Sequence, residues 1–353
     1  MMAMDQGFVK GLKSYIREKT PFAESMYKAW KGGQILRRIR ARYGEDTHVF
    51  LMRGATGDTY LQLALIENYI RERHIASYKI VADSARCREL GSLFQEKDLI
   101  AMNGYKVESI EKAYMLMGSR KLNLTILFPW TYTLYFNRCR IRMTERFHFM
   151  DTYQYYVLNL KDGMRIRRPR FRELPQERLK ELGTKGLRKG KTVIIAPEAN
   201  SVTQLESALW NKIIEGLAQK GYTVIVNVEQ NEGLCAPDYF CAYAESVPLL
   251  EYAGYFIGLR SGFCDIVSSA KCRKVVIYPA KTARADYSEH RTEIEFCGLK
   301  RMHLVEEKDD TLTEIDTPLV RNITDARQEL SGEEREYEQI ELIRKVLDCF
   351  ENI

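Results

Sequence analysis

The stretch Gly254–Pro279 constrains the fold more than any other part of the chain. It reads GYFIGLRSGFCDIVSSAKCRKVVIYP, in which two short apolar runs of β type flank a turn of small residues and a helix-length segment. A strand, a helix and a second strand in this order are typical of parallel sheets, where ligands bind beyond the carboxyl ends of the strands. We therefore predict a βαβ unit whose turn, Arg260 to Gly262, faces a ligand.

The same alternation recurs on both sides of a charged, proline-containing segment. Before that segment, the pattern predicts strands at 48–52, 79–82, 99–101 and 124–128 and a helix over 59–71. After it, the pattern predicts strands at 192–196, 223–228, 255–259 and 275–278 and a helix over 203–219, which Thr203 and Glu206 would open with capping-box spacing. Two such series predict an α/β fold of two Rossmann-like lobes facing across a cleft.

These patterns divide the 353 residues into five parts. Residues 1–44 form a basic helical extension, 45–165 the first Rossmann-like lobe, 166–190 a linker, and 191–332 the second lobe. Residues 333–353 form a final helix, which we expect to return and brace the first lobe.

The positive charge of the chain is concentrated at its start. Residues 1–44 hold ten Lys and Arg against three acidic residues, a net charge of +7, whereas the whole chain carries +6. Two apolar series at helical spacing lie among these cations: Phe8, Leu12 and Ile16, then Phe22, Met26 and Trp30. This region has two interpretations. It could make peripheral contact with an anionic membrane face, or its helices could pack on the body with a solvated cationic face.

A second basic tract, Lys161–Arg172, has six cations against one Asp in the expected interdomain region. Neither tract has the aromatic interleaving of an RNA-binding sheet or the pattern of a zinc finger, so we expect no nucleic-acid partner. The eight cysteines are scattered without C-x-x-C or zinc spacing, and we expect no metal. The N-terminal residues lack the apolar core of a secretory signal, which favours a cytoplasmic protein.

Two turns at predicted strand ends carry the chemistry. After the strand at 48–52, Gly54 and Gly57 allow a sharp turn, and Asp58 either caps the next helix or projects into the cleft as a base. At the Arg260 turn, free backbone N–H groups and the helix dipole would meet an anion, and the guanidinium beside them predicts a diphosphate site. The alternative is an ordinary buried strand, helix and strand with a solvated arginine. Glu229 and Asn231, past the strand at 223–228, either bind ribose hydroxyls or are surface-loop residues.

Three short motifs resemble those of GT-B glycosyltransferases of family 9, the group that includes the lipopolysaccharide heptosyltransferases. They are the Gly-Asp turn Thr56-Gly57-Asp58, the strand, turn and Trp-bearing helix of Val193–Trp210, and the turn and helix of Arg260–Pro279. The resemblance covers most of residues 46–280 in layout. It implies that the first lobe binds the acceptor and the second the donor nucleotide, with Asp58 as catalytic base.

The resemblance also implies a set of binding residues. Donor-binding residues would be Arg260, Ser261, Gly262, Asp265, Asn200, Ser201 and Glu229, and Gly57 and Thr59 would flank the base on the acceptor side. Arg260 stands where the family usually has Asp, Asp265 stands where it commonly has His, and the lysine ahead of the Trp helix has no counterpart. The donor sugar therefore does not carry over from heptosyltransferases.

The function we expect is that of an inverting, metal-independent glycosyltransferase with a nucleoside diphosphate sugar as donor, no cofactor, and a cell-surface glycan or lipid-linked precursor as acceptor. Asp58 would deprotonate the acceptor, and Arg260 would stabilise the leaving diphosphate. One alternative is another GT-B-like sugar-nucleotide enzyme such as an epimerase, which needs several acids and a histidine around one sugar. The other is a basic membrane or nucleic-acid adaptor, for which Asp58 would be dispensable.

Overall fold

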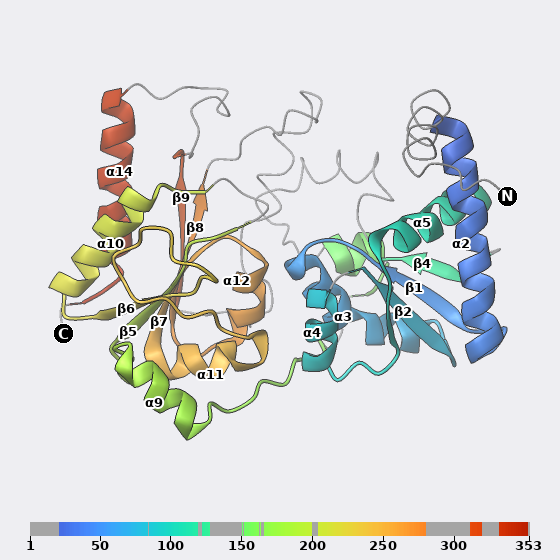
Figure 1. The fold of residues 1–353 in the computed structure, drawn as a ribbon, viewed down its shortest axis with the longest axis horizontal. Coiled ribbons are helices and arrows are strands. Elements are labelled where there is room, and N and C mark those ends of the chain that lie inside the picture. Colours follow the sequence, from blue (N-terminus) through green and yellow to red (C-terminus); the bar gives the residue numbers. More distant parts are fainter. Residues whose placement is uncertain are drawn as a thin grey trace, which may run out of the picture.

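The chain folds into two α/β lobes that lie side by side (Figure 1). The computed structural model describes residues 21–83, 85–118, 122–127, 150, 152–161, 163, 166–199, 204–279, 311–319 and 332–351. Each lobe is built on a parallel sheet, which confirms the predicted fold class.

The first lobe contains a four-stranded sheet in the order β3-β2-β1-β4. Its strands are β1 (His48–Met52), β2 (Tyr78–Ala82), β3 (Leu99–Ala101) and β4 (Leu124–Ile126). The helices of this lobe are α3 (Thr56–Glu72), α4 (Ala85–Leu93) and α5 (Gly104–Met117). The central strand β1 is buried from Val49 to Met52, as expected for a parallel strand covered on both faces.

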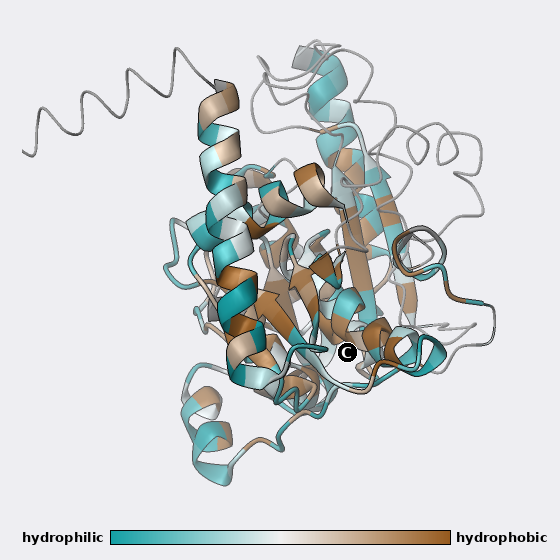
Figure 2. Ribbon diagram, turned by 90° about the vertical axis from the view of Figure 1, so that its right-hand side faces the viewer, coloured by the Kyte–Doolittle hydropathy of each residue, from teal (hydrophilic) through white to brown (hydrophobic). Residues whose placement is uncertain are grey.

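The second lobe contains a five-stranded parallel sheet in the order β6-β5-β7-β8-β9. Its strands are β5 (Thr192–Ala196), β6 (Thr223–Val226), β7 (Gly254–Leu259), β8 (Arg273–Pro279) and β9 (Leu312–Thr317). The helical elements of this lobe are α9 (Gln176–Thr184), α10 (Ser207–Gln219), α11 (Tyr243–Ala253), α12 (Gly262–Ile266), the 3₁₀ turn η3 (Val267–Ser269) and α14 (Gly332–Leu347). Figure 2 shows mostly hydrophobic strands enclosed by helices of mixed hydropathy.

Strand β7, helix α12 and strand β8 form the predicted βαβ unit, and β7 and β8 pair in parallel. Every predicted strand is present, with ends that differ by at most two residues. The edge strand β9 was not predicted, because its alternation of Leu, Glu and Asp hides the apolar face that packs on β8.

Two predicted helices differ from the structure. Helix α10 begins at Ser207 with Glu206 as its N-cap, so the predicted capping box, in which Glu206 would be the third helical residue, is wrong. Helix α14 does not brace the first lobe in the described part of the chain, because its buried Leu342 and Val346 belong to the core between β5, β7 and α10. Leu347 of α14 also packs directly over Gly216 of α10.

Helix α2 (Pro21–Tyr43) lies on the outside of the first lobe and packs along α5. Gly32 permits a close approach, since a Cβ there would overlap the backbone of Ser109. Lys28 is buried and pairs with Glu24 and Glu108 at 3.0 and 2.7 Å. Part of the basic extension is therefore neutralised inside the fold. The expected helix around Phe8 to Ile16 lies outside the described residues.

The lobes touch where α3 meets α12 (Figure 1). A Cβ on Gly262 would overlap the backbone nitrogen of Gly57, and a Cβ on Gly57 would overlap the Asp265 carboxylate. The Tyr243 backbone N–H also donates to Glu89 Oε1 across the junction at 3.0 Å. Two glycines thus let the two predicted functional turns approach each other.

Candidate functional site

A pocket of about 460 Å³ lies between the lobes at the carboxyl ends of β5, β6 and β7. The first lobe contributes Ala55 and Thr56 from the turn after β1. The second lobe contributes the remaining lining residues: Ala196, Glu198, Ala199, Asn227, Glu229, Gln230, Glu232, Phe240, Cys241, Tyr243, Ser261, Gly262 and Phe263. This position is where doubly wound sheets bind ligands.

The pocket lining is acidic and aromatic. Glu198, Glu229 and Glu232 contribute carboxylates, and none of the described lining residues is Lys or Arg. Burial raises the pKa of Glu198, and the nearby charges of Glu232 and Glu229 raise it further. These carboxylates can accept hydrogen bonds from hydroxyl groups such as those of a ribose or a sugar.

Asp58 lies in the first turn of α3, directly after the turn that contributes Ala55 and Thr56 to the pocket. Gly54 has a φ of +112°, a value that favours glycine, so the sharp turn predicted after β1 is present. Asp58 Oδ2 accepts a hydrogen bond from the Ala55 backbone N–H at 2.7 Å. Asp58 Oδ1 accepts one from the hydroxyl of Tyr153, on the π-helix η2 (Thr152–Val157). Asp58 therefore caps its helix and also faces the junction of the lobes.

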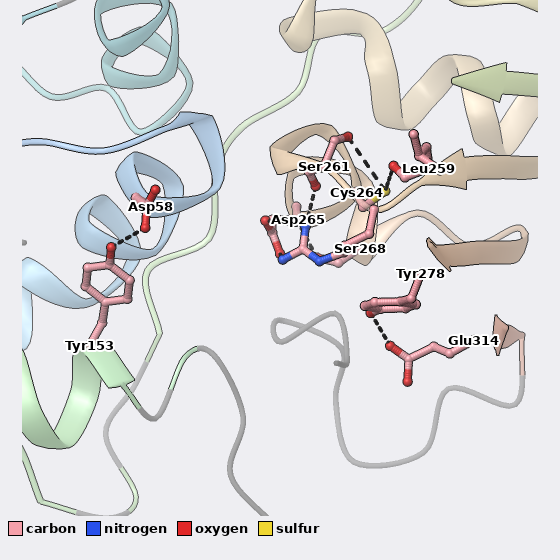
Figure 3. Close-up of polar contacts among 10 residues, drawn as sticks. Asp58, Tyr153, Leu259, Ser261, Cys264, Asp265, Ser268, Tyr278 and Glu314 are labelled. Carbon is pink, nitrogen blue, oxygen red and sulfur yellow. Dashed lines mark hydrogen bonds and ion pairs between the residues drawn. The ribbon is translucent and has the colours of Figure 1, made fainter. Parts of the chain in front are cut away.

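Arg260 and Asp265 form a buried ion pair beside this junction (Figure 3). The two terminal guanidinium nitrogens lie 3.0 and 2.9 Å from the two Asp265 carboxylate oxygens. The side chains are only 3% and 2% exposed. Burial alone would lower the pKa of Arg260, but the Asp265 carboxylate raises it above its ordinary value. The arginine is neither solvated nor part of the pocket lining, and both sequence-based interpretations of it differ from this arrangement.

The structure brings only some of the predicted site residues to the pocket. Ser261, Gly262 and Glu229 line it. Arg260, Asp265 and Asp58 are not among the lining residues, although Asp58 lies two positions after Thr56, which is one of them. Gly57 is a packing contact between the lobes. Thr59 is buried and its hydroxyl donates to the Ala55 carbonyl at 3.2 Å, so it does not face an acceptor.

The structure gives two expected features a different or weaker role, and other predicted residues lie outside the described part of the chain. Asn231 fixes its own loop, because its amide donates to the carbonyls of Leu234 and Ala236 at 3.0 and 2.8 Å. Helix α12 has only five residues, which weakens the expected helix-dipole contribution at its start. Asn200, Ser201 and the tract Lys281–Arg291 lie outside the described residues.

Several pocket residues were missed by the sequence analysis. Asn227 directly follows β6 and Glu198 follows β5 by two positions, so both could have been found by marking polar residues after each parallel strand. Asn227 is held in place because its side-chain oxygen accepts the Cys241 N–H at 2.8 Å. Phe240, Tyr243 and Phe263 reach the pocket from loops and helix starts, where no local pattern marks them.

Two further features bear on function. Among the described residues, no group of three or more His, Cys, Asp or Glu side chains is arranged to hold a metal ion. None of the described helices combines the length and apolar character that spanning a membrane requires.

Comparison with known proteins gives matches only among solved structures. No protein-family model matches the chain, and no curated protein sequence matches it. The iron-containing dodecameric glycosyltransferase TibC of enterotoxigenic E. coli H10407 is 13% identical, with 86% of this chain and 75% of that chain covered and a TM-score of 0.49. A family 9 glycosyl transferase from Veillonella parvula DSM 2008 is 13% identical, with 85% and 97% covered and a TM-score of 0.48.

A third similar structure is the E. coli ADP-heptose lipopolysaccharide heptosyltransferase II, at 13% identity, with 85% of this chain and 98% of that chain covered and a TM-score of 0.45. All three are described as glycosyltransferases or heptosyltransferases, the class of protein whose motifs this sequence resembles.

Proposed function

We propose that this chain is a glycosyltransferase that moves a sugar from a nucleoside diphosphate sugar to a hydroxyl group of a cell-surface glycan or lipid-linked precursor. One observation carries the proposal: the pocket at the carboxyl edge of the second sheet is closed from the first lobe by Ala55 and Thr56, which belong to the turn that leads into Asp58 at the start of α3. A nucleotide sugar and a hydroxyl acceptor need such a two-sided site, because each lobe can hold one reactant.

The proposed reaction is a single displacement with inversion and without a metal. The Asp58 carboxylate takes the proton of the acceptor hydroxyl, and the acceptor oxygen attacks the anomeric carbon of the donor. The bond between that carbon and the diphosphate oxygen breaks, and the nucleoside diphosphate leaves. Ser261 and Gly262 line the pocket on the donor side, where their backbone would face the leaving group.

Arg260 has an indirect role in this proposal. It holds Asp265 and, through its hydrogen bond to the Ser261 carbonyl, the turn that lines the pocket. Glu229 binds hydroxyl groups of the ribose or sugar, in keeping with its place in the acidic lining. None of the described lining residues is a histidine, which an epimerase would be expected to use for its proton transfers.

A thermal-shift panel of nucleoside diphosphates and nucleotide sugars tests the proposed donor class. A ligand that binds only the native state stabilises it by about 2.7 kcal/mol at a concentration of 100 times its Kd. We expect at least one nucleotide to raise the melting temperature. The Glu229→Gln variant should reduce this shift, whereas Glu215→Gln, which alters an exposed carboxylate on α10, should not. If no nucleotide shifts the transition, the donor class is wrong.

Peripheral contact with an anionic membrane is the second part of the proposal, and α2 is the surface that would make it. Phe22, Met26 and Trp30 are 74%, 46% and 53% exposed and lie four residues apart, so they form one apolar stripe. Arg37 and Arg38 are exposed further along the same helix. Exposed apolar side chains and exposed cations on one helix suit a surface of anionic lipid.

Co-sedimentation with vesicles tests this contact. Vesicles that contain phosphatidylglycerol should bind the protein more strongly than pure phosphatidylcholine vesicles do. Binding should fall as salt is added, because the screening length for the charges is only about 10 Å at 0.1 M ionic strength. Replacing Phe22 and Trp30 by Ser should weaken binding. The matched control is Ile340→Ser, which removes an apolar side chain that is 56% exposed on α14. Equal recovery on both vesicle types would instead favour α2 as a packed surface helix.

A further inference from the structure

Tyr153 makes a contact that the reaction proposed above does not use. Its side chain is fully buried, and its hydroxyl donates to Asp58 Oδ1 from an element far away in the sequence. Figure 3 shows the Tyr153 ring directed at Asp58 from below, while Asp265 lies across the junction. With the Ala55 N–H on Oδ2, each oxygen of the carboxylate has a donor.

We propose that Tyr153 is a positioning residue whose hydroxyl, by donating to Oδ1, fixes the Asp58 carboxylate at the junction of the lobes. The inference rests on the proposed role of Asp58 as the base. An aspartate in a first helical turn can adopt several rotamers, and the Ala55 contact alone holds only one oxygen. The Tyr153 contact holds the second oxygen and thereby sets the orientation of the carboxylate plane.

The charges around Asp58 explain why a donor is needed there. Burial raises the pKa of Asp58, and the hydrogen bonds from Tyr153 and the Ala55 N–H lower it. From the second lobe, the Asp265 carboxylate raises the pKa of Asp58 and the Arg260 guanidinium lowers it. Arg260 is already paired with Asp265, so the net charge of those two groups is small. Among the described residues, the Tyr153 hydroxyl is therefore the main side-chain group that favours the ionised form.

Tyr153 itself stays protonated. Burial raises the pKa of Tyr153 well above its ordinary value, and the Asp58 charge raises it further. The hydroxyl is thus a permanent donor and not a competing base. Its element supports a specialised role, since η2 is a π-helix and short π-helical segments frequently occur at functional sites.

The Tyr153→Phe variant tests the inference, because Phe keeps the ring and removes only the donor. The first readout is the titration of the Asp58 side-chain carboxyl by ¹³C NMR in protein labelled at aspartate, with the resonance assigned by its absence in Asp58→Asn. We expect the midpoint to move to higher pH. The control Tyr155→Phe removes a hydroxyl from the same π-helix, at a side chain 38% exposed, and should leave the midpoint unchanged.

The second readout is transfer. Near neutral pH, kcat of Tyr153→Phe should fall about 10- to 100-fold, the factor implied by losing a hydrogen bond to a charged group, with the donor KM little changed. The acid limb of the kcat profile should move to higher pH together with the NMR midpoint. An unchanged midpoint in a folded variant overturns the inference, whatever happens to kcat. A different outcome is that the midpoint moves but neither the parent protein nor any variant catalyses transfer. In that case the proposed function fails and the role of Tyr153 toward Asp58 stands.

Discussion

Replacing Asp58 by Asn is expected to lower the rate of glycosyl transfer by about 10²–10⁴, or roughly 3–5 kcal/mol of barrier. Asn keeps the size of the side chain, and its oxygen can still accept the Ala55 N–H, so α3 should keep its first turn. An amide cannot take the acceptor proton. The variant should therefore bind the donor as the parent does, and calorimetry with the best nucleotide from the thermal-shift panel checks this.

The pH profile provides an independent check on the same residue. Because burial raises the pKa of Asp58, the carboxyl loses its charge at a higher pH than an ordinary aspartate. The rate of the parent protein should fall as the pH drops through this pKa, and the limb should vanish from the residual rate of Asp58→Asn. A matched control is Asp46→Asn, at an exposed position before β1. If folded Asp58→Asn turns over at a near-parent rate, Asp58 is only a helix cap and another carboxylate must be the base.

Replacing Arg260 by Ala should lower the free energy of unfolding by about 3–5 kcal/mol, the effect of breaking a buried ion pair on one side. The variant leaves the Asp265 carboxylate buried at the junction without its guanidinium partner. Urea unfolding followed by circular dichroism measures the loss. Arg344→Ala is the control, because the same type of side chain there is 58% exposed and its pairs with Glu341 and Asp348 should contribute little.

A double-mutant cycle separates this structural role from direct ligand binding. If the pair acts as a unit, Arg260→Ala combined with Asp265→Ala should be more stable than the sum of the single losses implies. Direct contact between Arg260 and a diphosphate would give the opposite pattern: a small loss of stability, and nucleotide binding weaker by about 1.5–3 kcal/mol. That outcome would restore the role that the sequence suggests and contradict the pairing described above.

The strands were predictable because local sequence dictates them. Apolar runs such as His48–Met52 and Thr192–Ala196 are long enough to cross a sheet and are bounded by charged or turn residues, and the structure has the same ends. The order of strands in each sheet and the edge strand β9 depend on pairing between distant segments, which periodicity does not reveal. The packing of α14 is a similar case, since its apolar stripe fits either lobe and only the surface of α10 and β9 decides between them.

The turns of the candidate site could be predicted from the sequence, whereas the side chains that contact Asp58 and Arg260 could not. The positions of Asp58 and of Ser261 follow from small residues after strands. Tyr153 lies 95 residues from Asp58, so no spacing rule relates them. Arg260 and Asp265 are five residues apart, and an arginine at a strand end followed by an acid in the next helical turn was a signal for a pair. The hypothesis that the Arg260 guanidinium binds a diphosphate did not take this pairing with Asp265 into account.

The fate of the donor sugar tests the central claim most directly. A nucleotide sugar that stabilises the protein can be incubated with it and followed by ¹H NMR of the anomeric proton, with water or an added glycan as acceptor. We predict release of the nucleoside diphosphate and a product whose anomeric configuration is opposite to that of the donor, with both processes strongly slowed in Asp58→Asn. A product that retains the configuration of the donor, or equal consumption of the donor by Asp58→Asn, would contradict single displacement with Asp58 as the base.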